Sequence, residues 1–193
     1  CCRAHVECFE PDPTARGRLL RNIRLNSIDD KVRIHHVGLS DRSGTAQFTS
    51  NLDAMNHLVI DEDQHQHTDE IQLRTLDEVV RQEVHILKID VEGWETAVLR
   101  GATGVLSQPS LYACIVEINE SMKRYGFSEA DILTTMESYG FREVGYDPRL
   151  RMLINTPDRR LNNALFVRDR ELVAERLSEA PNRVVLGKNF VRN

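Results

Sequence analysis

The sequence predicts an α/β domain with a mostly parallel sheet and an antiparallel pair of strands at its edge. Short β-rich runs alternate with helical stretches along the chain, which is the order that β-α-β units require. The length of 193 residues suits one domain, and a composition of 40% hydrophobic and 28% charged residues is ordinary for a globular protein. We expect the domain to cover residues 1–178 and a tail to cover residues 179–193.

The first predicted unit is a strand, a helix and a second strand. A strand over residues 5–9 should end at Glu10, because the proline after it favours an extended backbone. The acid and proline at positions 12 and 13 are a helix-start signal, and residues 13–26 have an amphipathic pattern. A β-rich run over residues 32–37 follows as the second strand.

Polar and turn-forming residues dominate the next part of the chain. Residues 38–44 indicate a turn that leads into a hairpin strand over residues 45–49. Residues 50–70 are highly polar with weak periodicity, which predicts a long loop. The loop's histidines lack partner ligands at fixed spacing, so we expect no metal there; they are His57, His65 and His67.

The second half of the chain continues the alternation of helices and strands. Helices are expected over residues 76–81, 94–106, 128–139 and 170–177, and buried strands over residues 85–91 and 111–118. Two further β-like runs, residues 141–146 and 161–167, lie too close together for a helical crossover. They therefore predict an antiparallel pair at the sheet edge.

Composition and charge narrow the classes of function. The net charge of −5 repels phosphate backbones, so nucleic acid is not an expected partner. No run approaches the roughly 18 consecutive apolar residues of a membrane span. The four cysteines lack paired or zinc-finger spacing, which is typical of reduced thiols and favours a cytoplasmic protein. The sequence leaves the oligomeric state open.

Several polar residues should stand at the ends of the predicted strands. Ligands of open parallel sheets bind outside the carboxyl ends of the strands, where Glu10, residues 38–40, Asp90, Glu92 and Glu117 are expected. A carboxylate at Glu10 can accept two hydrogen bonds from a ribose diol. The alternative for Glu10 is an acid that merely faces water.

Three charges occupy alternate positions around the end of a central strand. Lys88, Asp90 and Glu92 should therefore project to one side of it. Because unpaired buried charge is costly, these groups must pair with one another, with Glu117, or with a ligand or metal ion. The alternative is a purely structural bridge between Lys88 and one of the acids.

Six segments of the chain carry a resemblance to a known family. They are CFEPDP at 8–13, LLRNIRLN at 19–26, GLSDRSGTAQF at 38–48, TLDEV at 75–79, LKIDVEGWETAVLRGA at 87–102 and IVEIN at 115–119. In order and spacing they resemble the FkbM family of S-adenosylmethionine-dependent methyltransferases. The segment LKIDVEG is the most specific of them, whereas FEP by itself would be a weak signal.

This resemblance implies a Rossmann-like class I methyltransferase sheet that binds S-adenosylmethionine. The implied reaction is O-methylation of a hydroxyl on a small molecule, a sugar or a secondary metabolite. By the same resemblance, Glu10 is the ribose-binding acid, and Gly38, Leu39 and Ser40 border the adenine. Asp90 is the acid near the methionine part of the cofactor and the acceptor.

Methyl transfer assigns clear tasks to the acids at the strand ends. Asp90, Glu92 or Glu117 could position the acceptor hydroxyl and take its proton as a general base. Alternatively, Asp90 and Glu92 could hold a hard divalent ion that lowers the pKa of that hydroxyl. Our prediction assigns the catalytic role to Asp90, Glu92 and Glu117 without a metal.

One departure from the family pattern concerns the start of the chain. Methyltransferases of this type open with a strand and a glycine-rich turn of the form D-x-G-A-N-x-G, and this chain begins at the strand that should come second. We therefore expect an N-terminally incomplete domain that lacks its first strand and helix. The missing strand would lie between the strands at 5–9 and 85–91.

Two other functions remain as alternatives. The chain could be an inactive fragment or a non-catalytic α/β binding module without cofactor, which the missing glycine turn favours and the charges at 88, 90 and 92 oppose. A nicotinamide-dependent dehydrogenase also needs an acid after its second strand, but it gives no account of KIDVEG.

Overall fold

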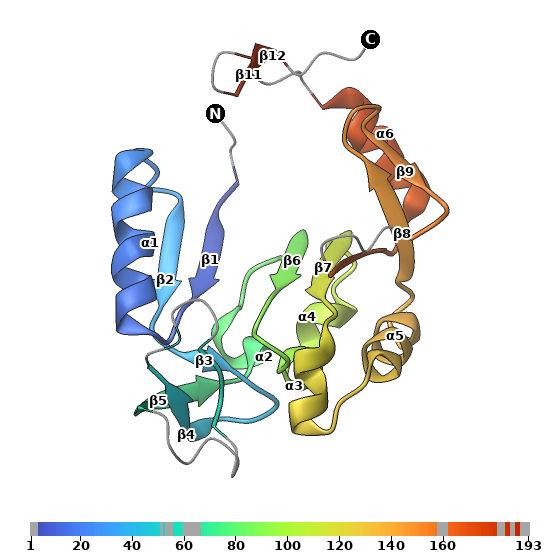
Figure 1. Cartoon of the computed structure of the whole chain (residues 1–193). Helices are drawn as coiled ribbons and strands as arrows, with labels where there is room; N and C mark the ends of the chain where they lie inside the picture. Colours follow the sequence, from blue (N-terminus) through green and yellow to red (C-terminus); the bar gives the residue numbers. More distant parts are fainter. Residues whose placement is uncertain are drawn as a thin grey trace.

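The computed structural model describes residues 4–50, 52, 56–59, 67–157, 162–180, 184–185 and 188–189. Within these residues the strands form four sheets with helices packed beside them (Figure 1). This arrangement confirms the α/β class. The expectation of a mostly parallel sheet is corrected, because five of the eight strand pairs in the described residues are antiparallel.

The first unit agrees with its prediction. β1 (Val6–Phe9) and β2 (Val32–His35) pair in parallel, and α1 (Pro13–Leu25) connects them. Asp12 caps the helix, because one of its carboxylate oxygens accepts a hydrogen bond from the Ala15 amide at 2.7 Å.

A three-stranded sheet follows, and it corrects the predictions of a turn over residues 38–44 and a loop over residues 50–70. β3 (Gly38–Leu39) is a strand parallel to β5 (Thr68–Arg74), where the sequence predicted only a turn over 38–44. β4 (Gly44–Thr49) is the predicted hairpin strand, and it pairs with β5 in antiparallel fashion.

β5 was missed because most of its side chains face solvent. Only Ile71 and Leu73 are buried in the segment TDEIQLR, so polar residues mask the alternation. The predicted loop over 50–70 therefore ends at the first residues of β5. Residues 51, 53–55 and 60–66 of that loop lie outside the described part of the chain.

The third part contains the most specific segment of the sequence. α2 (Leu76–Val79) and β6 (Ile86–Ile89) occur where helix and strand were expected. The single helix predicted over 94–106 is wrong, because the structure divides it into α3 (Glu95–Arg100) and α4 (Thr103–Ser107).

A carboxylate distant in sequence explains this break. Asp77 accepts hydrogen bonds from the amides of Gly104 at 2.7 Å and Val105 at 2.9 Å, which gives α4 a capped start of its own. The Asp77 amide in turn donates to the Gly101 carbonyl at 3.2 Å, at the end of α3. The backbone groups at the break are thus satisfied by α2.

The chain then forms β7 (Ala113–Glu117), the 3₁₀ helix η3 (Glu120–Tyr125), α5 (Glu129–Ser138) and β8 (Arg142–Asp147). β7 pairs with β6 in parallel. Ser128 and Asp131 form the capping box of α5, as their sequence spacing allows. No element was predicted for η3.

The larger sheet ends in antiparallel strands. β10 (Asn163–Val167) pairs with both β7 and β8, so the predicted antiparallel pair at the edge is confirmed, with residue 161 outside the described chain. The short strand β9 (Met152–Ile154) was not predicted and forms the outer edge. α6 (Arg170–Glu179) follows, and the predicted tail contains the short pair β11 (Val184–Val185) and β12 (Lys188–Asn189).

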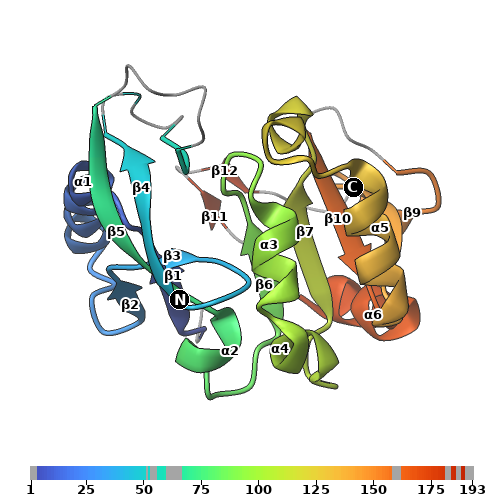
Figure 2. The same ribbon diagram turned by 90° about the horizontal axis from the view of Figure 1, so that it is seen from below.

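The main hydrophobic core lies between the larger sheet and α3, α4 and α5 (Figure 2). The predicted sheet-facing positions Val98, Ala102 and Val105 are buried, and Trp94 packs partly buried against the same core. By contrast, Ile23 is the one buried residue of α1. Most of the apolar burial therefore comes from the second half of the chain.

No strand ladder joins the two halves of the described chain. β1 pairs with β2, β6 pairs with β7, and β1 and β6 belong to different sheets. Val6 is 45% exposed and Ile86 is 66% exposed on these strands. Strand pairing is therefore broken between β1 and β6. Gln82 nevertheless donates a side-chain hydrogen bond to Glu7 at 2.7 Å, across the break.

Gly101 provides a stability test of the contact between α3 and the segment after β3. A Cβ at Gly101 would lie 2.0 Å from the Ser40 carbonyl oxygen, although the backbone φ of −86° suits any residue. We expect Gly101→Ala to lower the free energy of unfolding by about 1–3 kcal/mol, as overpacking does. Urea denaturation measures this change.

Gly17 in α1 is the matched control. A Cβ there meets nothing within 4 Å, so Gly17→Ala should raise stability by about 0.5–1 kcal/mol through helix propensity. Equal effects of the two substitutions would contradict the close packing of Gly101 on Ser40.

Candidate functional site

A cavity lies where the carboxyl ends of β1 and β6 meet the three-stranded sheet. Four of its lining side chains are acidic, namely Glu10, Asp12, Asp90 and Glu92, and its described lining contains no lysine, arginine or histidine. Apolar side chains form much of the remaining wall; they include Phe9, Leu39, Phe48, Leu58, Ile71 and Leu73. The cavity therefore suits a ligand that combines positive charge with apolar surface.

Glu10 forms the wall of the cavity beside β1. Its Oε1 accepts a hydrogen bond from the Asp12 amide at 2.9 Å, which orients the carboxylate at the start of α1. Burial raises the pKa of Glu10, and the Asp12 amide partly opposes this shift. A half-buried carboxylate in this position can bind neighbouring hydroxyl groups.

The segment after β2 also lines the cavity. Gly38 and Leu39 line the cavity, and a Cβ at Gly38 would lie 2.9 Å from the side chain of Leu73. Ser40 lies instead in the wall of a second cavity, which shares Leu58 and Leu73 with the first. The Ser40 hydroxyl accepts from the Trp94 indole at 3.2 Å and is 2% exposed as a residue.

The turn after β6 is fixed by a buried carboxylate. Glu95 is 1% exposed, and its Oε1 accepts hydrogen bonds from the amides of Val91 at 3.0 Å and Gly93 at 3.2 Å. Glu92 and Gly93 have φ values of +54° and +99°. A Cβ at Gly93 would lie 2.5 Å from the Ser121 carbonyl carbon, so this position requires glycine.

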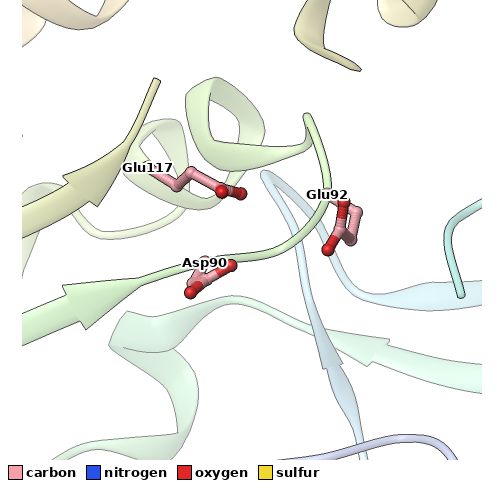
Figure 3. A group of neighbouring side chains, drawn as sticks. All are labelled: Asp90, Glu92 and Glu117. Atoms are coloured by element: carbon pink, nitrogen blue, oxygen red, sulfur yellow. The ribbon is translucent and has the colours of Figure 1, made fainter. Parts of the chain in front are cut away.

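This turn places Asp90 and Glu92 beside Glu117, the last residue of β7 (Figure 3). One carboxylate oxygen from each lies within 4.8 Å of the others. Asp90 also forms an ion pair with Lys88 at 2.6 Å, in which both side chains are about half exposed. The structural bridge and the acidic cluster therefore coexist, and an ion pair so exposed adds little stability.

The three carboxylates shift one another's protonation. Burial, followed by the charges of Asp90 and Glu92, raises the pKa of Glu117 to about 7. A hydrogen bond between the Glu117 and Asp90 carboxyls, which requires a proton on one of them, acts in the same direction. Burial and then the Asp90 charge also raise the pKa of Glu92. Glu117 can therefore gain or lose a proton near neutral pH, as a general base must.

The cluster has two possible chemical uses. Its oxygen atoms are ligands that a hard divalent cation would accept. Without a metal, the same groups can orient a hydroxyl and receive its proton. Our prediction remains the use without metal.

Comparison with known proteins identifies the family. The profile of the Methyltransferase FkbM domain matches residues 2–143, well over half of the chain. The chain belongs to the FkbM methyltransferase family.

A solved structure supports the same assignment at the level of fold. The crystal structure of Methyltransferase FkbM from Methylobacillus flagellatus KT superposes with a TM-score of 0.50 at 17% sequence identity. The match covers 85% of this chain and 36% of the other, so the chain spans about a third of that protein. The Rossmann-like class predicted from the sequence is thus confirmed. A search of curated proteins gives no significant match.

The FkbM chain brings most of its predicted site residues together. Glu10, Gly38, Leu39, Asp90 and Glu92 line one cavity, and Glu117 adjoins it through the acidic cluster. Ser40 stands apart, because it lines the second cavity. The individual roles of all these residues remain predictions.

None of the described helices is both long and apolar enough to cross a membrane.

Sequence reasoning missed three residues that shape this FkbM site. Glu95 holds the turn after β6, Trp94 links that turn to Ser40, and Asn56 in the predicted loop lines the cavity. Glu95 alone gave a usable signal, since an acid in the first turn of a helix often reaches back to free amides. The partners of Trp94 and Asn56 are too distant in sequence to be recognised.

Glu117→Gln tests the raised pKa of Glu117. The folded state holds the Glu117 proton more tightly than the unfolded state, so its contribution to stability is lost as pH rises from about 4.5 to about 7. The variant should therefore lose less stability than the unaltered protein between about pH 5 and pH 8. Urea unfolding at the two pH values measures the difference.

The control for this experiment is Glu83→Gln, which removes an exposed carboxyl. Its stability should follow the unaltered protein across the same pH range. An unchanged pH dependence in Glu117→Gln would show that Glu117 titrates normally.

Proposed function

We propose that the protein is an S-adenosylmethionine-dependent methyltransferase. The observation that carries this proposal is the cavity wall, in which acidic side chains from the ends of β1 and β6 meet without a basic one in the described lining. Such a wall attracts a sulfonium cation and repels the pyrophosphate of a nicotinamide dinucleotide. Membership of the FkbM family supports the same choice.

The donor would be held by residues of the cavity wall. S-adenosylmethionine supplies a methyl group activated on a positively charged sulfur. Glu10 would accept hydrogen bonds from the ribose hydroxyls, with its carboxylate already oriented by the Asp12 amide. Gly38 and Leu39 would border the adenine, and Ser40 would support this segment through Trp94. Asp90 would face the cationic end of the donor.

The acceptor would be a hydroxyl of a small molecule or sugar. Glu117, with a pKa of about 7, would take the hydroxyl proton as the oxygen receives the methyl group. Asp90 and Glu92 would orient the hydroxyl, and their charges would keep the pKa of Glu117 raised. Most of the acceleration would come from alignment of oxygen and methyl carbon at about 3–3.5 Å. The net charge of −5 further disfavours a nucleic-acid acceptor.

Glu10→Ala tests the donor site. Loss of the ribose contacts should weaken the binding of S-adenosylmethionine by about tenfold or more, measured by isothermal titration calorimetry. Glu137→Ala on the exposed face of α5 is the control and should leave the affinity unchanged. Unchanged affinity in Glu10→Ala would refute the ribose role. No binding by the unaltered protein would favour the alternative of an inactive fragment or a non-catalytic module.

Asp90→Asn tests the catalytic cluster. The isosteric amide removes the charge beside Glu117 and the donor, so methyl transfer should fall by about a hundredfold or more while the protein stays folded. Transfer of labelled methyl to a hydroxyl acceptor and circular dichroism measure the two effects. The control Asp29→Asn changes an exposed acid before β2. Retained turnover in Asp90→Asn would remove Asp90 from the mechanism.

A further inference from the structure

We infer that Asn56 is a positioning residue for Glu10, acting through Asp12; this inference rests on the proposed function. Asn56 reaches back 44 positions, and its side-chain amide donates to the Asp12 carboxylate at 2.9 Å. Asp12 then donates its backbone amide to Glu10 at 2.9 Å. A continuous set of hydrogen bonds thus connects the predicted loop to the ribose-binding acid.

The Asp12 carboxylate needs this contact with Asn56. Asp12 is 5% exposed, so both of its oxygens require partners. Oδ1 caps α1 through the Ala15 amide, and Oδ2 receives the Asn56 amide. Loss of the Asn56 bond would leave a buried carboxylate oxygen without this donor, at the residue whose backbone orients Glu10.

Asn56 is itself held in place by its own segment. Two hydrogen bonds connect Thr49 and His57. The Thr49 amide donates to the His57 carbonyl at 3.0 Å, and the Thr49 side-chain hydroxyl accepts from the His57 amide at 2.9 Å. The Tyr125 hydroxyl donates to the Leu58 carbonyl at 2.9 Å. The side-chain oxygen of Asn56, Oδ1, accepts from the Leu52 amide at 2.9 Å. These contacts give the Asn56 side chain one orientation toward Asp12.

Charge and position predict opposite effects of Asn56→Asp. Asn56 and Asp12 both line the cavity, so a new carboxylate at 56 adds negative charge that should strengthen the binding of a cationic donor. The same carboxylate would face the Asp12 oxygen that Asn56 now contacts. Repulsion there should displace Asp12 and Glu10 and weaken donor binding.

The polarity of the pair can also be exchanged. In the double variant Asp12→Asn, Asn56→Asp, the amide at 12 would donate to the carboxylate at 56, and the total charge of the cavity would be unchanged. Asparagine retains the ability to cap α1, and the carboxylate at 56 can still accept from the Leu52 amide. The double variant should therefore restore the arrangement.

The experiment measures the Kd of S-adenosylmethionine by calorimetry, kcat at saturating donor, and thermal stability for the unaltered protein and both variants. Asn56→Asp should raise the Kd about tenfold with little change in kcat, and the double variant should return the Kd to within about threefold of the original. Asn22→Asp, on the exposed surface of α1, is the matched control and should bind as the unaltered protein does.

The outcomes separate the inference from the proposed function. Unchanged or tighter binding in Asn56→Asp, a double variant that remains as weak as the single one, or a loss of thermal stability without a change in Kd would each overturn the role of Asn56. Failure of the unaltered protein to bind S-adenosylmethionine would overturn the proposed function and the inference with it.

Discussion

The indole of Trp94 joins the two loops on which the site depends. Because β1 and β6 share no ladder, the cavity walls are held in register by contacts between loops rather than by strand pairing. Trp94 contributes a hydrogen bond to Ser40 and ring contacts to Tyr125 and Phe127. Gly101 allows α3 to approach the same Ser40 backbone. The observed contacts of Ser40 are therefore structural, because they connect the segment after β3 to Trp94 and α3.

The fold prediction succeeded for elements that local sequence patterns specify and failed where contacts between distant residues decide the structure. α1, β6 and α5 have local patterns, including a helix cap or a short apolar run, and the structure contains all three. The break between α3 and α4 depends on Asp77, which lies more than twenty positions earlier, so helical periodicity continued across it. The prediction missed β5 for a different reason. One face of its small sheet is exposed, and the polar residues there resemble those of a loop.

The site residues were likewise predicted where topology alone decides their position, and missed where a specific long-range contact decides it. The sheet topology predicts that acids at strand ends meet, and Glu10 and Asp90 do line one cavity. The shift in the Glu117 pKa could not be predicted from sequence, because it depends on burial and on the distances among three carboxylates. Asn56 could not be singled out within its polar segment, because its importance depends on one hydrogen bond to Asp12, 44 positions away. Pairs of this kind leave no spacing signal.

The acidic cavity wall also affects how the proposed reaction cycle would end. Transfer of a methyl group converts a sulfonium cation into a neutral thioether. Carboxylates that attract the first have no comparable attraction for the second, since the Coulomb contribution disappears with the charge. The spent cofactor would thus lose the attraction at its sulfur, and its exchange for a fresh molecule would be favoured by the acidic wall.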